Sequence, residues 1–272
     1  MPFLSIQNGE RKLYYTSSST PETLRDGSRP TLVFVHGLGS SSSFFAPIIP
    51  AITAAGYACL ALDTHGMGIS PFAGPDGGDE QIIKDTAEAM QAFHLSHNRT
   101  IIVGHSLGGH IASEIALRYP VAGAILLGPW YPNRELAHIF QTRIKVVEEQ
   151  GLDGAVDIVL ASATGPKATP LQRAFIRTLI LSSTPEGYTS ACNTLMNSQR
   201  PDYSKITCPV LIIAGTHDRT TPLATSETIL NSWGCTESQK KIVVLDIAHW
   251  HCIEAPEEVT AATLDFLGDL KF

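Results

Sequence analysis

Six short, continuously apolar runs recur along this chain, separated by longer stretches in which apolar residues follow helical spacing. The runs are residues 32–35, 58–62, 101–103, 124–127, 210–213 and 242–245. A strand that is apolar at every position is typical of a parallel sheet with both faces covered. Alternation of such strands with helices favours an α/β fold. We therefore expect a mostly parallel sheet flanked by helices, with each of the six strands buried on both faces.

Three segments depart from this alternation. Residues 3–6 and 12–16 predict an antiparallel hairpin ahead of the first buried run, and the Ser-, Thr- and Pro-rich segment 17–30 predicts a loop. Between residues 130 and 203 no strand-like run occurs and helical periodicity dominates. This indicates a helical cap inserted after the sixth strand, counting the hairpin. We expect a core of residues 1–129 and 204–272 and a cap of residues 130–203.

The composition excludes several classes of function. The 272 residues are 43% apolar and 17% charged, as in ordinary globular proteins, and the formal net charge of −7 predicts no basic face for nucleic acid or anionic lipid. No apolar run approaches the roughly 18 residues that span a membrane, and the first nine residues lack the basic region and apolar core of a signal peptide. We expect a cytoplasmic protein that acts on a small molecule. Its oligomeric state stays open.

Motifs for metals and cofactors are missing from the sequence. The Gly-rich segment 63–70 lacks the G-x-G-x-x-G spacing of a dinucleotide site, and the histidine pairs form no H-E-x-x-H motif. The cysteines form no C-x-x-C pair, which disfavours a zinc site or a disulfide framework. They are Cys59, Cys192, Cys208, Cys235 and Cys252. We therefore expect neither a metal nor a cofactor.

The segment Gly104-His105-Ser106-Leu107-Gly108 matches the G-x-S-x-G pattern of a nucleophile elbow. The pattern alone is weak, but here it follows the apolar run 101–103 and precedes an amphipathic helical stretch, residues 107–119. An elbow requires this strand–turn–helix context. A serine hydroxyl is a weak nucleophile and needs a base, which a carboxylate must orient.

Asp218 is the predicted acid and His249 the predicted base. Asp218 follows the run 210–213, in the segment GTHDRTTP, and no carboxylate follows the run 124–127 until Glu135. The alternative is that Asp218 caps the helix after Pro222. Two histidines follow the last run; we assign the base to His249 and keep His251 as the alternative. The order Ser, Asp, His is that of the α/β-hydrolase triad.

The segment His36-Gly37-Leu38-Gly39 ends the first apolar run. Its main-chain N–H at Leu38, together with that of Leu107, would form an oxyanion hole beside Ser106. Because one base suffices, we expect His36 to anchor this loop rather than to catalyse.

Five motifs occur in the order HGLG, DTHGMGIS, GHSLGG, GTHDRTTP and AHWHCIEAP, and they identify the chain as a member of the α/β-hydrolase fold family. The segments TPEGYTSAC and PVLIIAG resemble the 3-oxoadipate enol-lactonase branch. The resemblance implies a triad of Ser106, Asp218 and His249, and a lactone or enol-lactone of a small carboxylic acid as substrate. Two features depart from that branch: His105 before the serine and the segment GPWYP. Trp130 in that segment would either line the pocket and favour a bulkier substrate, or pack as an anchor of the cap.

These observations predict a serine hydrolase that cleaves a lactone or a carboxylic ester through an acyl-enzyme intermediate. A C–C bond hydrolase acting on a vinylogous diketone would use the same triad. A non-catalytic hydrolase-fold binding protein is disfavoured because all the catalytic parts are present. An acidic substrate would need a cap arginine, and Arg143, Arg173 and Arg177 are available. We expect each of these three to be a solvated charge on a helix face.

Overall fold

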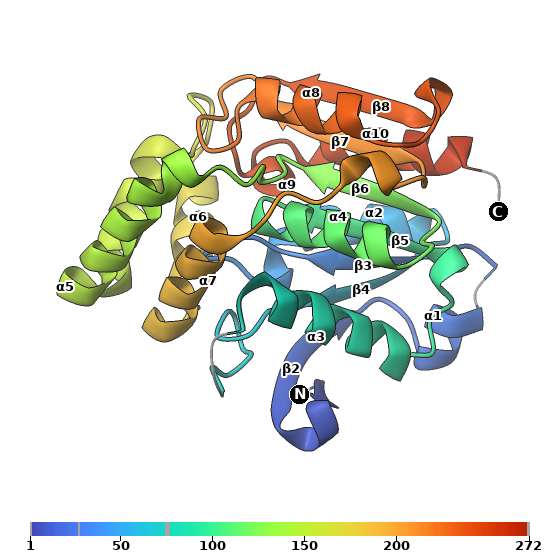
Figure 1. The fold of residues 1–272 in the computed structure, drawn as a ribbon, viewed down its shortest axis with the longest axis horizontal. Coiled ribbons are helices and arrows are strands. Elements are labelled where there is room, and N and C mark those ends of the chain that lie inside the picture. Colours follow the sequence, from blue (N-terminus) through green and yellow to red (C-terminus); the bar gives the residue numbers. More distant parts are fainter. Residues whose placement is uncertain (1, 27, 74–76, 271–272) are drawn as a thin grey trace.

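All six apolar runs lie in strands of one sheet. The computed structural model describes residues 2–26, 28–73 and 77–270. Within them, eight strands pair in the order β1-β2-β4-β3-β5-β6-β7-β8 (Figure 1). The strands are β1 (Phe3–Ile6), β2 (Arg11–Ser17), β3 (Thr31–Val35), β4 (Ala58–Leu62), β5 (Thr100–His105), β6 (Gly123–Leu127), β7 (Val210–Gly215) and β8 (Lys240–Leu245).

The sheet is parallel from β4 to β8, whereas β1 and β2 form the expected antiparallel hairpin and β2 pairs antiparallel with β4. The central strands β3 to β7 are buried at every position, as their continuous apolar character predicted. β8 is different, because it lies at the edge of the sheet and is only partly covered; its Val244 is 43% exposed. The prediction that all six strands are buried on both faces is therefore wrong for β8.

Helices cover both faces of the sheet. Figure 1 shows α3, α4 and α8 in front of it and α2 and α10 behind it. The α-helices are α1 (Pro21–Asp26), α2 (Ile49–Ala54), α3 (Gly78–Ala92), α4 (Leu107–Arg118), α5 (Ala137–Ser162), α6 (Pro170–Leu181), α7 (Pro185–Asn197), α8 (Leu223–Ser232), α9 (His251–Glu254) and α10 (Pro256–Asp269).

The short helix α1 corrects the prediction of a loop over residues 17–30. Pro21 occupies its first position, where a missing N–H costs nothing, and the Thr20 hydroxyl accepts from the main-chain N–H of Thr23 at 3.3 Å. Leu24 anchors the helix in the core. This segment is rich in Ser, Thr and Pro and nevertheless forms a short capped helix.

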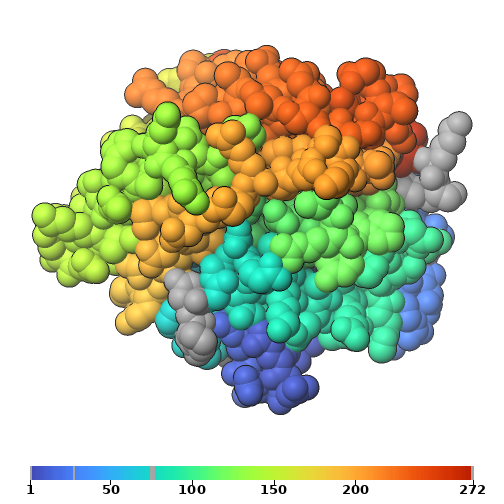
Figure 2. Space-filling view, in the orientation of Figure 1, coloured from blue at the N-terminus to red at the C-terminus, as the bar shows by residue number. Residues whose placement is uncertain are grey.

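The three helices α5, α6 and α7 fill the interval between β6 and β7, where the sequence predicted a helical cap. α6 begins with a capping box between Thr169 and Gln172, and Pro starts both α6 and α7. The helices form a group at one end of the sheet (Figure 1) and pack closely against the rest of the molecule on the face seen in Figure 2. The fold is that of the α/β-hydrolases, with a helical cap after the sixth strand.

The cap lies over the carboxyl ends of the parallel strands. The Thr184 N–H donates to the Gly66 carbonyl at 2.9 Å, and the His249 N–H donates to the Ala163 carbonyl at 3.2 Å. Loops at this edge hold the binding sites of open α/β sheets. The fold therefore brings the cap and the loops after β5, β7 and β8 together.

Candidate active site

Ser106 lies at the turn between β5 and α4. Its backbone angles, φ 54° and ψ −116°, are ones that residues other than glycine rarely adopt. Two neighbouring glycines permit the turn. A Cβ atom at Gly104 would lie 2.0 Å from the Gly108 carbonyl oxygen, and one at Gly108 would lie 2.0 Å from the Val35 carbonyl oxygen. The turn thus has the strand–turn–helix geometry that a nucleophile elbow requires.

Asp218 and His249 form a buried pair. The His249 Nδ1 donates to the Asp218 carboxylate at 2.7 Å, and that carboxylate also accepts from the Thr221 hydroxyl at 2.7 Å and from the Thr221 N–H at 2.9 Å. Burial opposes ionisation of Asp218, but the neighbouring His249 and Thr221 outweigh it and hold the pKa of this carboxyl well below its usual range. An ionised Asp218 fixes the tautomer that leaves His249 Nε2 free to accept a proton.

Ser106 and His249 open onto one cavity at the boundary between the core and the cap. This cavity is small, about 20 Å³. The cavity is lined by Leu38, Ser106, Trp130, Phe140, Arg143, Val159, Ala163, Leu195, Thr220, His249 and Trp250.

Leu38 and Leu107, the residues predicted to form an oxyanion hole, both lie near Ser106. Leu38 lines the cavity beside Ser106, and Leu107 is the first residue of α4. Within residues 2–26, 28–73 and 77–270, neither main-chain N–H donates to a protein acceptor. Two unpaired donors beside a strained serine are suited to bind a developing oxyanion.

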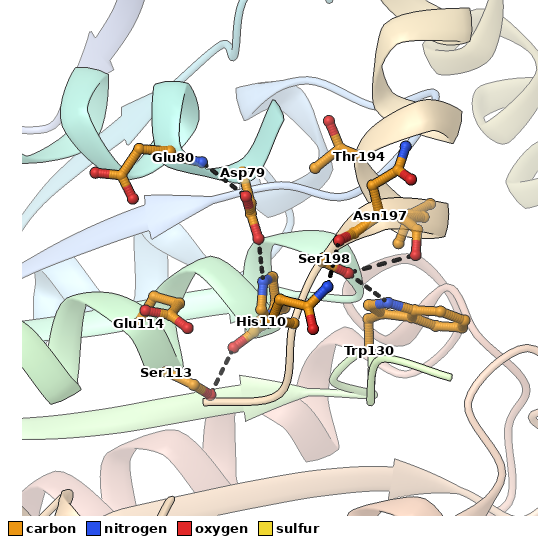
Figure 3. A network of polar contacts seen from close by, with 12 residues as sticks. Asp79, Glu80, His110, Ser113, Glu114, Trp130, Thr194, Asn197 and Ser198 are labelled. Atoms are coloured by element: carbon orange, nitrogen blue, oxygen red, sulfur yellow. Dashed lines mark hydrogen bonds and ion pairs between the residues drawn. The ribbon is translucent and has the colours of Figure 1, made fainter. Parts of the chain in front are cut away.

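Trp130 both lines the cavity and anchors the cap. Its indole Nε1 donates to the Ser198 hydroxyl at 3.3 Å, and its ring meets Phe140 edge-on at 5.3 Å between centroids. Figure 3 shows Trp130 beside Ser198 at the end of α7, close to the His110–Asp79 pair that joins α4 to α3. Trp130 therefore packs as an anchor of the cap while it lines the cavity, and its contact with a substrate stays a prediction.

Two further buried histidines flank the base. His105 Nε2 and His251 Nδ1 both donate to the main-chain carbonyl of His249, at 2.9 and 2.8 Å. Burial lowers the pKa of His251 to about 4 and that of His105 well below its ordinary value, so both rings are neutral near pH 7. Asp218 bonds His249, and His251 is not among the residues that line the cavity in the described part of the chain. This geometry favours His249 over His251 as the base.

Because His105 and His251 are buried and neutral, we expect the free energy of unfolding to decrease in mild acid. Their folded pKa values are depressed below the ordinary value of about 6.5, so between about pH 6.5 and 4 the unfolded chain binds protons that the folded chain does not. The free energy of unfolding should therefore fall as the pH falls, by about 2 kcal/mol from His251 alone between pH 7 and pH 5. Urea denaturation across this range measures the slope. His251→Asn should flatten it, and an equal slope in the variant would contradict the assignment.

Two residues that the sequence did not single out hold the base loop in place. Thr221 bonds the Asp218 carboxylate, as described above. The Glu254 carboxylate accepts from the N–H groups of Ala248 and Trp250, on either side of His249, at 3.1 and 3.0 Å, and from the N–H of Gly165 in the cap at 2.9 Å. Both residues lie inside quoted motifs, GTHDRTTP and AHWHCIEAP, but only the fold shows what they bond.

The three cap arginines considered for an acidic substrate differ from one another. Arg177 is exposed and pairs with Asp153, as expected. Arg173 is half-buried and donates to the Thr164 hydroxyl and to the carbonyls of three residues, Leu160, Gly165 and Ala168. Arg143 is 9% exposed and lines the cavity. The prediction of a solvated helix-face charge is therefore wrong for Arg143, and Arg173 serves to join α5 to α6.

His36 anchors the loop that carries Leu38. Its Nδ1 donates to the Gly37 carbonyl at 2.8 Å, and its Nε2 accepts from the Thr64 N–H at 2.9 Å.

In the residues that the structure describes, no group of three or more His, Cys, Asp or Glu could hold a metal ion. No helix among those residues is long and apolar enough to cross a membrane.

Comparison with known proteins shows the family of this chain. Residues 26–254 match the family described as serine aminopeptidase, S33. The chain belongs to this family. It is 27% identical over 252 residues to a putative carbamate hydrolase RutD of Escherichia coli O81, covering 89% of this chain and 92% of that one. It is 25% identical over 241 residues to 3-oxoadipate enol-lactonase 2 of Acinetobacter baylyi, covering 86% and 87%.

Solved structures show the same fold. The enol-lactonase from Burkholderia xenovorans LB400 superimposes with a TM-score of 0.85 at 24% identity, covering 98% of this chain and 100% of that one. An esterase from Exiguobacterium antarcticum superimposes with a TM-score of 0.83 at 19% identity, covering 98% and 99%. The protein is thus a hydrolase of the α/β-hydrolase fold that resembles the enol-lactonase branch.

Proposed function

We propose that this protein is a serine hydrolase that cleaves a carboxylic ester or lactone through an acyl-enzyme. The observation that carries the proposal is the buried Asp218–His249 pair, which opens onto the same cavity as the strained Ser106. A base held by an ionised carboxylate can accept the serine proton as the hydroxyl attacks. The resemblance to enol-lactonases and esterases supports the choice of an ester or lactone.

The reaction would proceed in two halves. Ser106 Oγ attacks the substrate carbonyl while His249 Nε2 takes its proton, and the N–H groups of Leu38 and Leu107 bind the oxyanion. Collapse of the tetrahedral intermediate breaks the C–O bond, and His249 returns the proton to the leaving alkoxide. Water then attacks the acyl carbonyl while His249 takes a proton from it. Collapse of this second intermediate breaks the bond between the acyl carbon and Ser106 Oγ, His249 returns the proton to Oγ, and the acid is released. In a lactone, the acid and the alcohol remain parts of one product.

The cap would exclude bulk water and shape the acyl pocket. We propose the division into a core of residues 1–129 and 204–272 and a cap of residues 130–203 on this basis. Residues on both sides of that boundary, such as Leu38 and Phe140, line the cavity.

Labelling with a fluorophosphonate, followed by peptide mass spectrometry, tests the nucleophile, and Ser106 should carry the adduct. A panel of lactones, linear esters, carbamates and vinylogous diketones tests the reaction, with the largest kcat/KM expected for a lactone or an ester. Hydrolysis of the diketone alone would instead assign C–C bond cleavage. Absence of both labelling and turnover would contradict an enzymatic role.

A further inference from the structure

A charged side chain from the cap borders the cavity that contains Ser106 and His249. Arg143 lies on α5 and is 9% exposed, and its neighbours along the cavity wall include Phe140 and Val159. A guanidinium stays charged in proteins. The cavity therefore contains a buried cation next to the proposed nucleophile and base.

Within the described residues, this cation has no counter-ion. In the described residues, no carboxylate lies within ion-pair distance of Arg143, and its Nε has no hydrogen-bond partner. Its guanidinium carbon lies 5.7 Å from the centre of the Phe140 ring, a weak cation–π contact. Such a contact does not replace an ion pair at a buried site.

Two neighbours that could ionise remain neutral. Burial raises the pKa of Tyr188 and of Cys192, both on α7, to about 12, although the Arg143 charge opposes the rise. Neither group supplies a negative charge near neutral pH. The Tyr188 hydroxyl is itself buried without a partner that meets hydrogen-bond geometry. Among the described residues, therefore, none supplies a negative charge to compensate Arg143.

Two further cap arginines, Arg173 and Arg177, do not share this arrangement. Arg177 pairs with Asp153 at the surface, and Arg173 has four protein acceptors. A buried charge without a partner is unfavourable, so a site that retains one gains most when a ligand provides the opposite charge. A planar guanidinium matches a carboxylate, which it can bind through two parallel hydrogen bonds.

We propose that Arg143 binds a carboxylate carried by the substrate, so that the enzyme selects small anionic esters or lactones over neutral ones. This inference rests on the proposed function, because it assigns the reacting carbonyl to Ser106. The small cavity joins Arg143 to Ser106 and His249, so the carboxylate and the reacting carbonyl belong to one short molecule. Hydrolysis of such a linear ester yields a dicarboxylate and an alcohol, and hydrolysis of such a lactone yields one hydroxy-dicarboxylate.

Matched pairs of substrates test the charge directly. The monomethyl esters of succinate, glutarate and adipate are compared with methyl esters in which an isopropyl group replaces the carboxylate. At one chain length, the wild-type protein should prefer the anionic ester, and R143Q should lose about 30-fold or more of kcat/KM on that ester. The neutral ester should change by less than about threefold. R143K should retain part of the preference, because it keeps the charge without the planar fork.

R177Q is the matched control, since it removes a cap arginine that lies outside the cavity, and it should leave the preference intact. Two results would overturn the proposal: a wild-type protein with no preference at any chain length, or an R143Q variant that loses activity equally on both members of a pair. The second result would show that Arg143 only maintains the cap.

A binding measurement keeps the proposal testable if R143Q folds poorly. Glutarate should raise the Tm of the wild-type protein and of R177Q, relative to sodium chloride at the same ionic strength, and should not raise that of R143Q. No shift in the wild-type protein would overturn the inference. Fluorophosphonate labelling separates the two proposals: labelled Ser106 without anion selectivity refutes only the role of Arg143, whereas an unlabelled protein that glutarate stabilises refutes only the hydrolase.

Discussion

Replacing Ser106 with alanine should lower kcat by about ten-thousand-fold or more on the best ester or lactone of the panel. The physical reason is that the variant has no Oγ to form the acyl-enzyme, while the Asp218–His249 pair and the cavity remain. Residual catalysis would come only from binding and the oxyanion donors. Steady-state kinetics, with loss of the fluorophosphonate adduct, measure the effect.

Ser113→Ala is the matched control. Ser113 is also buried on α4, but its hydroxyl donates to the Gly109 carbonyl within the helix at 2.9 Å and is absent from the cavity wall of the described residues. This variant should keep kcat within about threefold, because such a bond contributes only to stability. If Ser106→Ala retained more than about a hundredth of the wild-type rate, another group would be the nucleophile.

The fold was largely predictable because burial on both faces leaves a continuous apolar signal. That signal located all the strands of the parallel sheet, but it could not tell a central strand from the edge strand β8. The sequence gives the apolar character of residues 242–245, whereas their half-burial depends on β8 having one neighbour only. The prediction of a loop over residues 17–30 was wrong for a different reason. Ser, Thr and Pro favour helix starts as well as loops, and α1 is short.

The residues of the proposed triad could be predicted because they follow β5, β7 and β8 in a fixed order. The supporting residues could not. His105 and His251 bond the His249 carbonyl from different segments, and Glu254 joins the base loop to Gly165 in the cap. These contacts depend on tertiary packing. Arg143 did carry a local signal, because it lies three residues after Phe140 and four before Val147, on the buried stripe of α5. A cation on an apolar stripe indicates either a paired charge or a ligand site.

The same substitution at two histidines should have opposite outcomes. The amide nitrogen of an asparagine can occupy the place of a histidine Nδ1 but provides nothing at Nε2. His249→Asn removes the atom that would accept the serine proton, so kcat should fall by about ten-thousand-fold or more. His251→Asn keeps a donor for the His249 carbonyl, which His251 Nδ1 bonds at 2.8 Å, so kcat should stay within about tenfold.

Urea denaturation of the two variants separates chemistry from folding. His251 is fully buried, so His251→Asn should lose more stability at pH 7 than His249→Asn, although it keeps more activity. Loss of activity would then fail to follow loss of stability, which is the pattern expected for a base and its structural neighbour. An equal collapse of kcat in both variants would contradict His249 as the base. A large loss confined to His251→Asn would transfer that role to His251, and Asp218 would then have to bond a ring that it does not bond in this structure.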